Sequence, residues 1–247
     1  MTDDINDKFE KGFTSEEKIE RPRYQINLTR DLKYQNEYTL ALDGQYSHVA
    51  FNEERAPLNK GEWRSRVFSA DWNQPLDLEV GTGNGTHFKH HALKHPERLL
   101  VGFELKYKPL IQTIRRTLVA GAKNACVARV HAFNLDLLFA PSEINDVYIH
   151  FPDPWVTPRK PKNRFVQTRN LDLLWELQRP GSKLEFKTDS REYFLWSMEQ
   201  IRESKYKIEF ETLDLHRSSI AAENFETAFE KIFLRQGIEI NFVRLRR

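Results

Sequence analysis

The sequence contains one cysteine in 247 residues and no long run of hydrophobic residues. The single cysteine, Cys126, lies in the apolar stretch 125–128 and excludes a disulfide framework or a zinc cluster built on cysteines. No stretch approaches the roughly 18 apolar residues that identify a membrane-spanning helix. Residues 1–4 are polar and acidic and do not resemble a signal peptide. We therefore expect a cytoplasmic protein with no membrane partner.

The net charge is also small, at +2. Such a close balance of acidic and basic residues argues against a protein that wraps nucleic acid over its whole surface, but it allows a local basic patch. We expect residues 1–65 to form an N-terminal extension and residues 66–247 to form one α/β domain. The extension should begin disordered, because its start has few apolar anchors. Its later part is a basic, aromatic arm that either packs against the domain or contacts the active site or RNA.

The rest of the chain alternates predicted strands and helices, the pattern of a parallel sheet with right-handed crossovers. Helices are indicated by apolar residues at helical spacing and by proline or glycine where they end. We predict strands at 76–80, 99–104, 125–131, 146–151, 183–187, 206–213 and 238–245, and helices at 86–95, 108–120, 166–178, 190–203 and 226–235.

The most informative segment is the glycine-rich turn after the first of these strands. Gly81, Gly83 and Gly85 lack a Cβ, so the backbone can pass close to a ligand. Their spacing differs from the dinucleotide fingerprint. Glu79, just before them, would repel a pyrophosphate but can accept hydrogen bonds from an ammonium or hydroxyl group. A nucleoside that carries an amino acid fits better than a nicotinamide cofactor.

The second strand ends in Glu104, where a doubly wound fold places the acid that binds ribose hydroxyls. Taken alone, each feature has a plainer explanation. The alternatives are that the glycines only cap a strand and that Glu104 is a solvated strand end. Their order in one chain favours a cofactor site.

The segments 79–85 and 101–104 resemble the first two motifs of S-adenosylmethionine-dependent methyltransferases with a Rossmann-like fold. Four later features, in order and spacing, resemble the tRNA (guanine-N7)-methyltransferases: residues 151–155 (Phe-Pro-Asp-Pro-Trp), the basic run that follows, 186–189 (Phe-Lys-Thr-Asp) and 227–230 (Thr-Ala-Phe-Glu). The resemblance implies a mostly parallel seven-stranded sheet with helices on both faces and an antiparallel last strand. It also implies methyl transfer from S-adenosyl-L-methionine to N7 of a guanosine in the variable loop of tRNA.

Asp153 is the predicted catalytic residue, because it follows the fourth strand at the edge where open α/β sheets place their sites. Pro152 and Pro154 restrict its backbone. The resemblance places Asp153 where the cofactor methyl group and the guanine meet, in contact with both. It also implies an adenine-binding acid after the third strand, where Asn134 stands and Asp136 is a rival.

The resemblance implies five substrate-binding positions: Thr157, Arg159, Asp189, Thr227 and Glu230. The family usually has lysine where this chain has Thr157, and the alternatives are that Arg159 replaces it or that the protein acts on a somewhat different RNA. Carboxylates suit the N1–H and amino group of guanine. The alternatives are that Asp189 caps the next helix and that Glu230 is a surface residue. The cations at 159, 160, 162, 164 and 169 are interpreted as a phosphate-binding loop rather than as a solvated face.

His87 and His91 lie one helical turn apart, but no acidic residue on that helix completes a ligand set, so we predict no metal site. A competing function is an RNA-binding methyltransferase homologue that is non-catalytic or acts on a different RNA. Thr157 and Asn134 keep that alternative open. The sequence leaves a monomer and a homodimer equally open.

Overall fold

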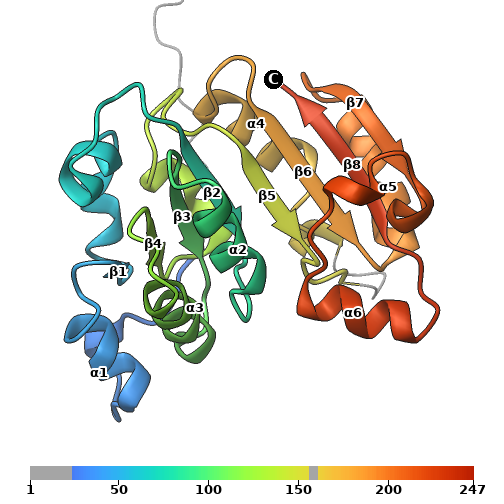
Figure 1. Cartoon of the computed structure of the whole chain (residues 1–247). Coiled ribbons are helices and arrows are strands. Elements are labelled where there is room, and N and C mark those ends of the chain that lie inside the picture. The colour runs from blue at the N-terminus through green and yellow to red at the C-terminus, as the bar shows by residue number, and fades with distance from the viewer. Residues whose placement is uncertain (1–23, 156–160) are drawn as a thin grey trace, which may run out of the picture.

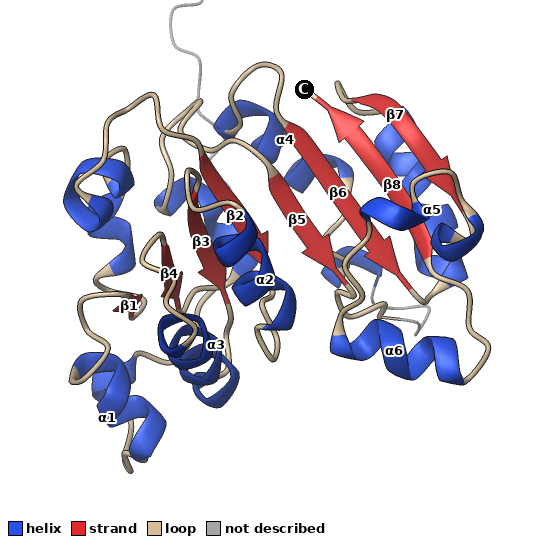
Figure 2. Ribbon diagram, in the orientation of Figure 1, coloured by secondary structure: helices blue, strands red, loops and turns tan. Residues whose placement is uncertain are grey.

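The structure is built on an eight-stranded sheet with helices on both faces (Figures 1 and 2). The computed structural model describes residues 24–155 and 161–247. The strand order is β1-β4-β3-β2-β5-β6-β8-β7, and β8 pairs antiparallel with β6 and with β7, whereas all the other pairs are parallel. The strands are β1 (Ala50–Phe51), β2 (Leu76–Val80), β3 (Leu99–Phe103), β4 (Ala125–Ala128), β5 (Val147–His150), β6 (Lys183–Thr188), β7 (Lys207–Thr212) and β8 (Asn241–Arg246). The mostly parallel sheet with an antiparallel last strand is confirmed.

The sequence predicted seven strands, and the sheet of the described residues has eight. The additional strand, β1, has two residues and pairs parallel with β4, with Ala50 opposite Val127 and Phe51 opposite Ala128. It lies within the segment that the sequence assigns to an N-terminal arm. Arg55 ties this segment together, because its guanidinium donates to the carbonyls of Ser47 (2.7 Å) and Ala50 (2.8 Å).

Helices cover the two faces of the sheet in separate groups. Helices α1 (Glu37–Asp43), α2 (Thr86–Lys94) and α3 (Tyr107–Val119) share one apolar cluster, and α2 and α3 lie in front of the sheet in Figure 1. The opposite face carries α4 (Thr168–Leu177) and α5 (Arg191–Arg202). Helix α6 (Ala228–Arg235) lies instead at the carboxyl edge of β5 and β6 (Figure 1). Within the described ranges, no helix has the length and apolar character needed to cross a membrane.

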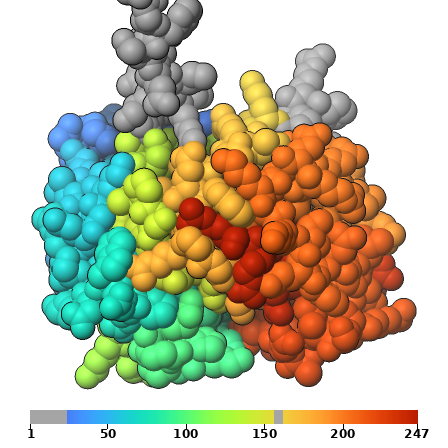
Figure 3. All heavy atoms as spheres, turned by 90° about the horizontal axis from the view of Figure 1, so that it is seen from above, coloured from blue at the N-terminus to red at the C-terminus, as the bar shows by residue number. Residues whose placement is uncertain are grey.

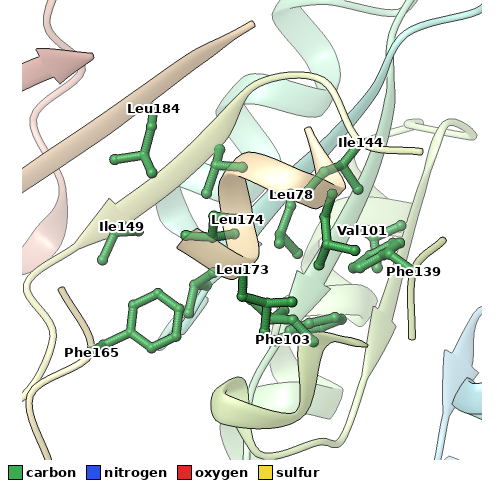
Figure 4. Close-up of a cluster of buried hydrophobic side chains, with 14 of the residues drawn as sticks. Leu78, Val101, Phe103, Phe139, Ile144, Ile149, Phe165, Leu173, Leu174 and Leu184 are labelled. Atoms are coloured by element: carbon green, nitrogen blue, oxygen red, sulfur yellow. The ribbon is translucent and has the colours of Figure 1, made fainter. Parts of the chain in front are cut away.

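The larger core lies between the sheet and α4. Leu173 and Leu174 of α4 pack with Leu78, Val101 and residues of neighbouring strands, as Figure 4 shows. Leu100, between two residues of this core, instead joins the cluster under α2 and α3, because successive side chains of a strand point to opposite faces. Burying each such side chain contributes about 1.5–3 kcal/mol.

The carboxyl ends of β2, β3, β4 and β5 meet at one edge of the sheet. Strand β2 lies between β3 and β5. The strands that follow β2 in the chain are added first on its β3 side and then, from β5 on, on its other side, and this reversal of the strand order opens a crevice at the strand ends. The opposite edge, seen from above in Figure 3, carries the surface-exposed end of the chain in red. The glycine turn, Glu104 and the segment 151–153 all lie at the crevice.

Candidate active site

A cavity of about 820 Å³ opens at this crevice. Its wall combines the glycine turn, the ends of β3, β4 and β5, and the beginning of α6. The volume falls in the range of small-molecule sites, roughly 300–1,000 Å³. Six residues predicted from the sequence line it: Glu79, Gly81, Gly83, Glu104, Asp153 and Thr227.

The glycine turn depends on positive φ angles, which are +78° at Gly81, +54° at Gly83 and +74° at Gly85. Gly81 and Gly83 line the cavity, whereas Gly85 does not and instead begins α2. A Cβ on Gly85 would lie 2.8 Å from the Cα of Thr113 on α3. Two of the glycines therefore form the ligand surface, and the third allows the turn to pass against α3.

Glu104 is connected to the glycine turn. Its carboxylate accepts hydrogen bonds from the backbone N–H of Gly83 (3.1 Å) and of Lys106 (2.9 Å). These bonds fix a half-buried carboxylate in the cavity wall next to the bare backbone. A carboxylate held in this way can accept hydrogen bonds from the two hydroxyls of a ribose.

Glu79 is 2% exposed and lies in the same wall. One carboxylate oxygen is 2.7 Å from Nδ1 of His87 on α2. Burial raises the pKa of Glu79 to about 8, although the positive charges of His91 and Lys187 act in the opposite direction. Burial, with the charges of Lys187 and His91, lowers the pKa of His87 well below its ordinary value. At neutral pH the shared proton therefore resides on the carboxyl group.

Asp153 is exposed and reaches the cavity from the segment after β5. Phe151 (φ +52°) and Trp155 (φ +44°) hold left-handed conformations on either side of it. Such conformations cost of order 1–3 kcal/mol each for residues with a side chain and cluster at functional sites. The backbone N–H of Phe151 donates to the carbonyl of Lys187 (2.8 Å), which anchors the turn to β6. A constrained turn thus presents an exposed carboxylate.

Asn134 lies outside the cavity wall, as does its rival Asp136. The Asn134 amide is committed to the backbone of Tyr24: its oxygen accepts from the N–H (3.1 Å) and its nitrogen donates to the carbonyl (2.8 Å). Residues 130–133 after β4 line this end of the cavity, and the Tyr24 ring stacks on His131 with the ring centroids 4.5 Å apart. Tyr24 belongs to the basic, aromatic arm expected from the sequence, but the sequence did not specify its contact with Asn134, which is 110 residues away.

Thr227 and Glu230, predicted as a pair of substrate contacts, are separated by the fold. Thr227 lines the cavity, and its side chain accepts a hydrogen bond from the backbone of Glu230 (3.1 Å) at the start of α6. Glu230 is fully buried behind it, with its carboxylate 2.6 Å from Nζ of Lys187. The structure therefore places Glu230 behind the wall, where it holds Thr227 in position, and excludes the alternative of a surface residue.

Asp189 follows β6, is half-buried and is absent from the cavity wall. Burial raises its pKa, and a hydrogen bond from its own backbone offsets part of that effect. Ser190, rather than Asp189, caps α5 by accepting from the N–H of Tyr193 (3.3 Å). Thr157 and Arg159 lie outside the described residues.

Two cations of the predicted phosphate-binding loop have internal roles. Arg164 is buried, and its guanidinium donates to both oxygens of Glu192 (2.7 Å each) and to the carbonyl of Pro154 (2.8 Å). Arg169 donates to the hydroxyl of Tyr24 (2.6 Å). The interpretation of the whole run as a phosphate site is therefore wrong for Arg164, which supports the turn that carries Asp153.

The histidines of α2 do not form a metal centre in the part of the chain that the structure describes. His87 pairs with Glu79, and Nε2 of His91 lies 2.9 Å from Asp77 of β2. The acidic partners absent from the helix come from the strand beneath it.

Comparisons with known proteins identify the family of the chain. Residues 73–243 match a family model described as a putative methyltransferase. A tRNA (guanine-N(7)-)-methyltransferase of Bdellovibrio bacteriovorus is 68% identical over 208 residues, covering 84% of this chain and 100% of that protein. One from Clostridium acetobutylicum is 33% identical over 184 residues, covering 74% of this chain and 85% of that protein. The solved structure of the 16S rRNA methyltransferase KamB matches with a TM-score of 0.52 at 16% identity, over 74% of this chain and 90% of that one, which shows a shared fold alone.

Proposed function

Because the chain belongs to the tRNA (guanine-N7)-methyltransferase family, we propose that it transfers the methyl group of S-adenosylmethionine to N7 of a guanosine in the variable loop of tRNA. The observation that carries the proposal is the convergence of the glycine turn, two carboxylates suited to the cofactor and the exposed Asp153 on one cavity. The non-catalytic alternative is not favoured.

The cavity suits the cofactor at both of its polar ends. Glu79 would accept from the ammonium group, and Glu104 from the ribose hydroxyls. The adenine would lie beyond the ribose, against His131 and Phe133. When bound, S-adenosylmethionine supplies a methyl group on a positively charged sulfur. Gly81 and Gly83 leave the backbone open along this path.

The remaining task of the protein is to position the guanine. N7 of guanine carries a lone pair in the plane of the ring, so no side chain has to remove a proton before attack. Holding reacting atoms about 3–3.5 Å apart can supply several kcal/mol of barrier reduction. Asp153, on its constrained turn, would orient the base by accepting from N1–H and the amino group, or stabilise the positive charge that develops on the purine.

Substrate contacts are proposed where the cavity supports them. Thr227 lies in the wall and is held by the buried Glu230, so Thr227 is the residue of that pair that would touch the guanosine. Asp189 is retained as a proposed contact to the guanosine although it does not line the cofactor cavity, and Thr157 and Arg159 are retained as proposed substrate contacts that lie outside the described residues.

The test uses the full chain, unmodified tRNA and methyl-labelled S-adenosylmethionine. We expect label in tRNA and N7-methylguanosine in its nucleoside digest. Asp153→Asn should remove transfer while cofactor binding persists, and Glu199→Gln, at an exposed position of α5, should behave as wild type. Binding of cofactor and tRNA by the wild-type protein without any transfer of label would support the non-catalytic alternative instead.

A further inference from the structure

A second cavity, of about 430 Å³, lies behind the cofactor cavity. It is lined by histidines of α2, by Tyr148 of β5 and by residues of β6 and β8. Two residues line both cavities, His87 and His150. Their rings meet edge to face, with centroids 4.3 Å apart. These two imidazoles therefore separate the floor of the cofactor site from the second cavity.

We infer that His87 is a positioning residue for the cofactor: it directs the Glu79 carboxylate at the cofactor's ammonium group and carries the Glu79 proton away through the second cavity. The inference rests on the proposed function only in that S-adenosylmethionine occupies the first cavity. It assigns a role to a helix residue that lies outside the glycine turn.

The hydrogen bonding of Glu79 supports the positioning role of His87. Among the described residues, the side chain of His87 is the hydrogen-bond partner of the Glu79 carboxylate. The rest of that carboxylate's acceptor capacity remains available to the cavity that it lines. Without His87, a carboxyl group that is almost fully buried would have no protein donor and would remain neutral. A neutral carboxyl group does not attract an ammonium group.

The second step is the movement of one proton. In the free protein, the Glu79 hydroxyl donates to Nδ1 of His87, and the ring carries its hydrogen on Nε2. When an ammonium group binds, the Glu79 proton passes to Nδ1 and the hydrogen on Nε2 leaves toward the second cavity. The new Nδ1–H then donates to the carboxylate, and one proton is released for each cofactor bound. Groups from four elements face this pair and influence the transfer: His90, His91, Tyr148, His150, Glu185, Lys187 and Glu230.

His150 is placed to assist this release. Its Nδ1 is buried and has no hydrogen-bond partner within the described ranges. Unpaired buried polar atoms are uncommon in folded proteins and call for an explanation. An imidazole with an open nitrogen, in contact with His87 and lining the second cavity, can relay the released proton. Burial, with the charges of His87, Lys187 and His91, lowers the pKa of His150 well below its ordinary value, so this ring passes the proton on to the cavity rather than retaining it.

A matched control exists one turn along the same helix. His91 also meets a buried carboxylate, Asp77, at 2.9 Å. Asp77 additionally accepts from Arg98 Nε (2.6 Å) and from the backbone N–H of Asp146 (3.1 Å), and it does not line the cofactor cavity. Both histidines are therefore comparable in burial and partner, but only His87 acts on a carboxylate that faces the cofactor.

The experiment compares two ligands by calorimetry on the full chain. S-adenosylmethionine has the ammonium group, and 5′-methylthioadenosine lacks the whole amino-acid part. His87→Phe removes both ring nitrogens, His87→Asn keeps a donor close to the position of Nδ1, and His91→Phe is the control. We expect His87→Phe to weaken S-adenosylmethionine roughly 10- to 100-fold, the usual size of one hydrogen bond to a charged group, with little change for 5′-methylthioadenosine. His87→Asn should restore much of the affinity.

Titrations at pH 7 in buffers of different ionisation enthalpy count the protons released. Wild type should release a proton with S-adenosylmethionine and none with 5′-methylthioadenosine, and His91→Phe should keep the ligand selectivity of wild type. Unchanged ligand selectivity in His87→Phe would overturn the inference while leaving the proposed function intact. If His87→Phe does not fold, selectivity and proton release unchanged in His87→Asn would overturn the route through the imidazole. Wild-type protein that binds neither ligand would remove the proposed function together with the inference.

Discussion

Replacing Glu230 with Gln tests whether this residue supports the fold or contacts the guanosine. The carboxylate is fully buried and lies 2.6 Å from Nζ of Lys187. It also accepts from the side chain of Asn224 (2.6 Å) and from the backbone N–H of Thr227 (3.2 Å), and lies 2.8 Å from Nε2 of His216. Glutamine keeps the volume but removes the charge. We therefore expect the variant to leave Lys187 buried without its counter-charge, with the oxygens of Asn224 and Phe225 as its remaining acceptors.

Breaking a buried ion pair by removing one partner costs about 3–5 kcal/mol. For a chain of this size, each kcal/mol lowers the melting temperature by about 2–4 °C, so the expected loss is roughly 6–20 °C. The double variant Lys187→Met with Glu230→Leu should recover most of it, because well-packed apolar residues often replace a buried ion pair without a loss of stability.

The assay is urea and thermal unfolding of the full chain at several pH values. Burial raises the pKa of Glu230, but the Lys187 charge and the hydrogen bonds from Lys187, Asn224 and Thr227 more than offset this, so the folded-state pKa lies below the ordinary 4.5. The ion pair therefore stabilises the protein fully above pH 4.5, and this contribution is lost as the pH falls through the folded-state value. The difference between wild type and variant should shrink in acid.

The reasoning fails if Glu230→Gln unfolds like wild type but binds tRNA less tightly. That result would restore the direct guanosine contact that the family resemblance implies. Glu226→Gln, at an exposed neighbouring position, serves as the control and should alter neither property by more than about 0.5 kcal/mol.

Three further predictions concern residues in the cavity wall or beside it. Gly85→Ala should lower both stability and cofactor affinity, because it combines left-handed strain of about 1–2 kcal/mol with a clash against α3; Gly121→Ala has the strain without the clash, so a chemical unfolding curve should separate the two. Asn134→Asp removes the donor to the Tyr24 carbonyl and should cost about 1–3 kcal/mol of local stability, seen as faster amide exchange at Tyr24, and unchanged exchange would contradict it. The raised pKa of Glu79 means that the cofactor-free protein should lose stability as the pH rises from 4.5 to about 8, by at most about 1.4 kcal/mol per pH unit, and Glu79→Gln should flatten that slope in melting curves taken across this range.

The parts of the fold that were predictable are those with a local signal. Strand β2 was predicted at its observed bounds, and the predicted helix 108–120 corresponds to α3 (Tyr107–Val119), because apolar spacing and Gly121 mark that helix in the sequence itself. Strand β1 was not predicted, because a strand of two residues is too short to show an alternating pattern. Its existence depends on pairing with β4, which is distant in the sequence.

The candidate site divides in the same way. The glycine turn and Asp153 could be identified from neighbouring residues, and both reach the cavity. The arm that contains Tyr24 was expected near the site or RNA, but its contacts could not be predicted, because they depend on an amide 110 positions away. The burial of Glu230 could not be predicted either, because it depends on the ion pair with Lys187 of β6, which is distant in the sequence.

The contacts between β2 and α2 explain why one histidine of that helix acts on the cofactor site and the next does not. Asp77 and Glu79 are two residues apart on a strand, so they point to the same face about 6.6 Å apart. His87 and His91 are four residues apart on a helix, about 6 Å along its axis, so the two spacings match. Because the helix runs back along the strand, Glu79 at the strand's end meets His87 at the helix's start, and Asp77 meets His91. In the pair of Asp77 and His91, the carboxylate also accepts a hydrogen bond from Arg98. The pair of Glu79 and His87 lies where the strand ends at the cavity, so the remaining acceptor capacity of Glu79 is available to a ligand.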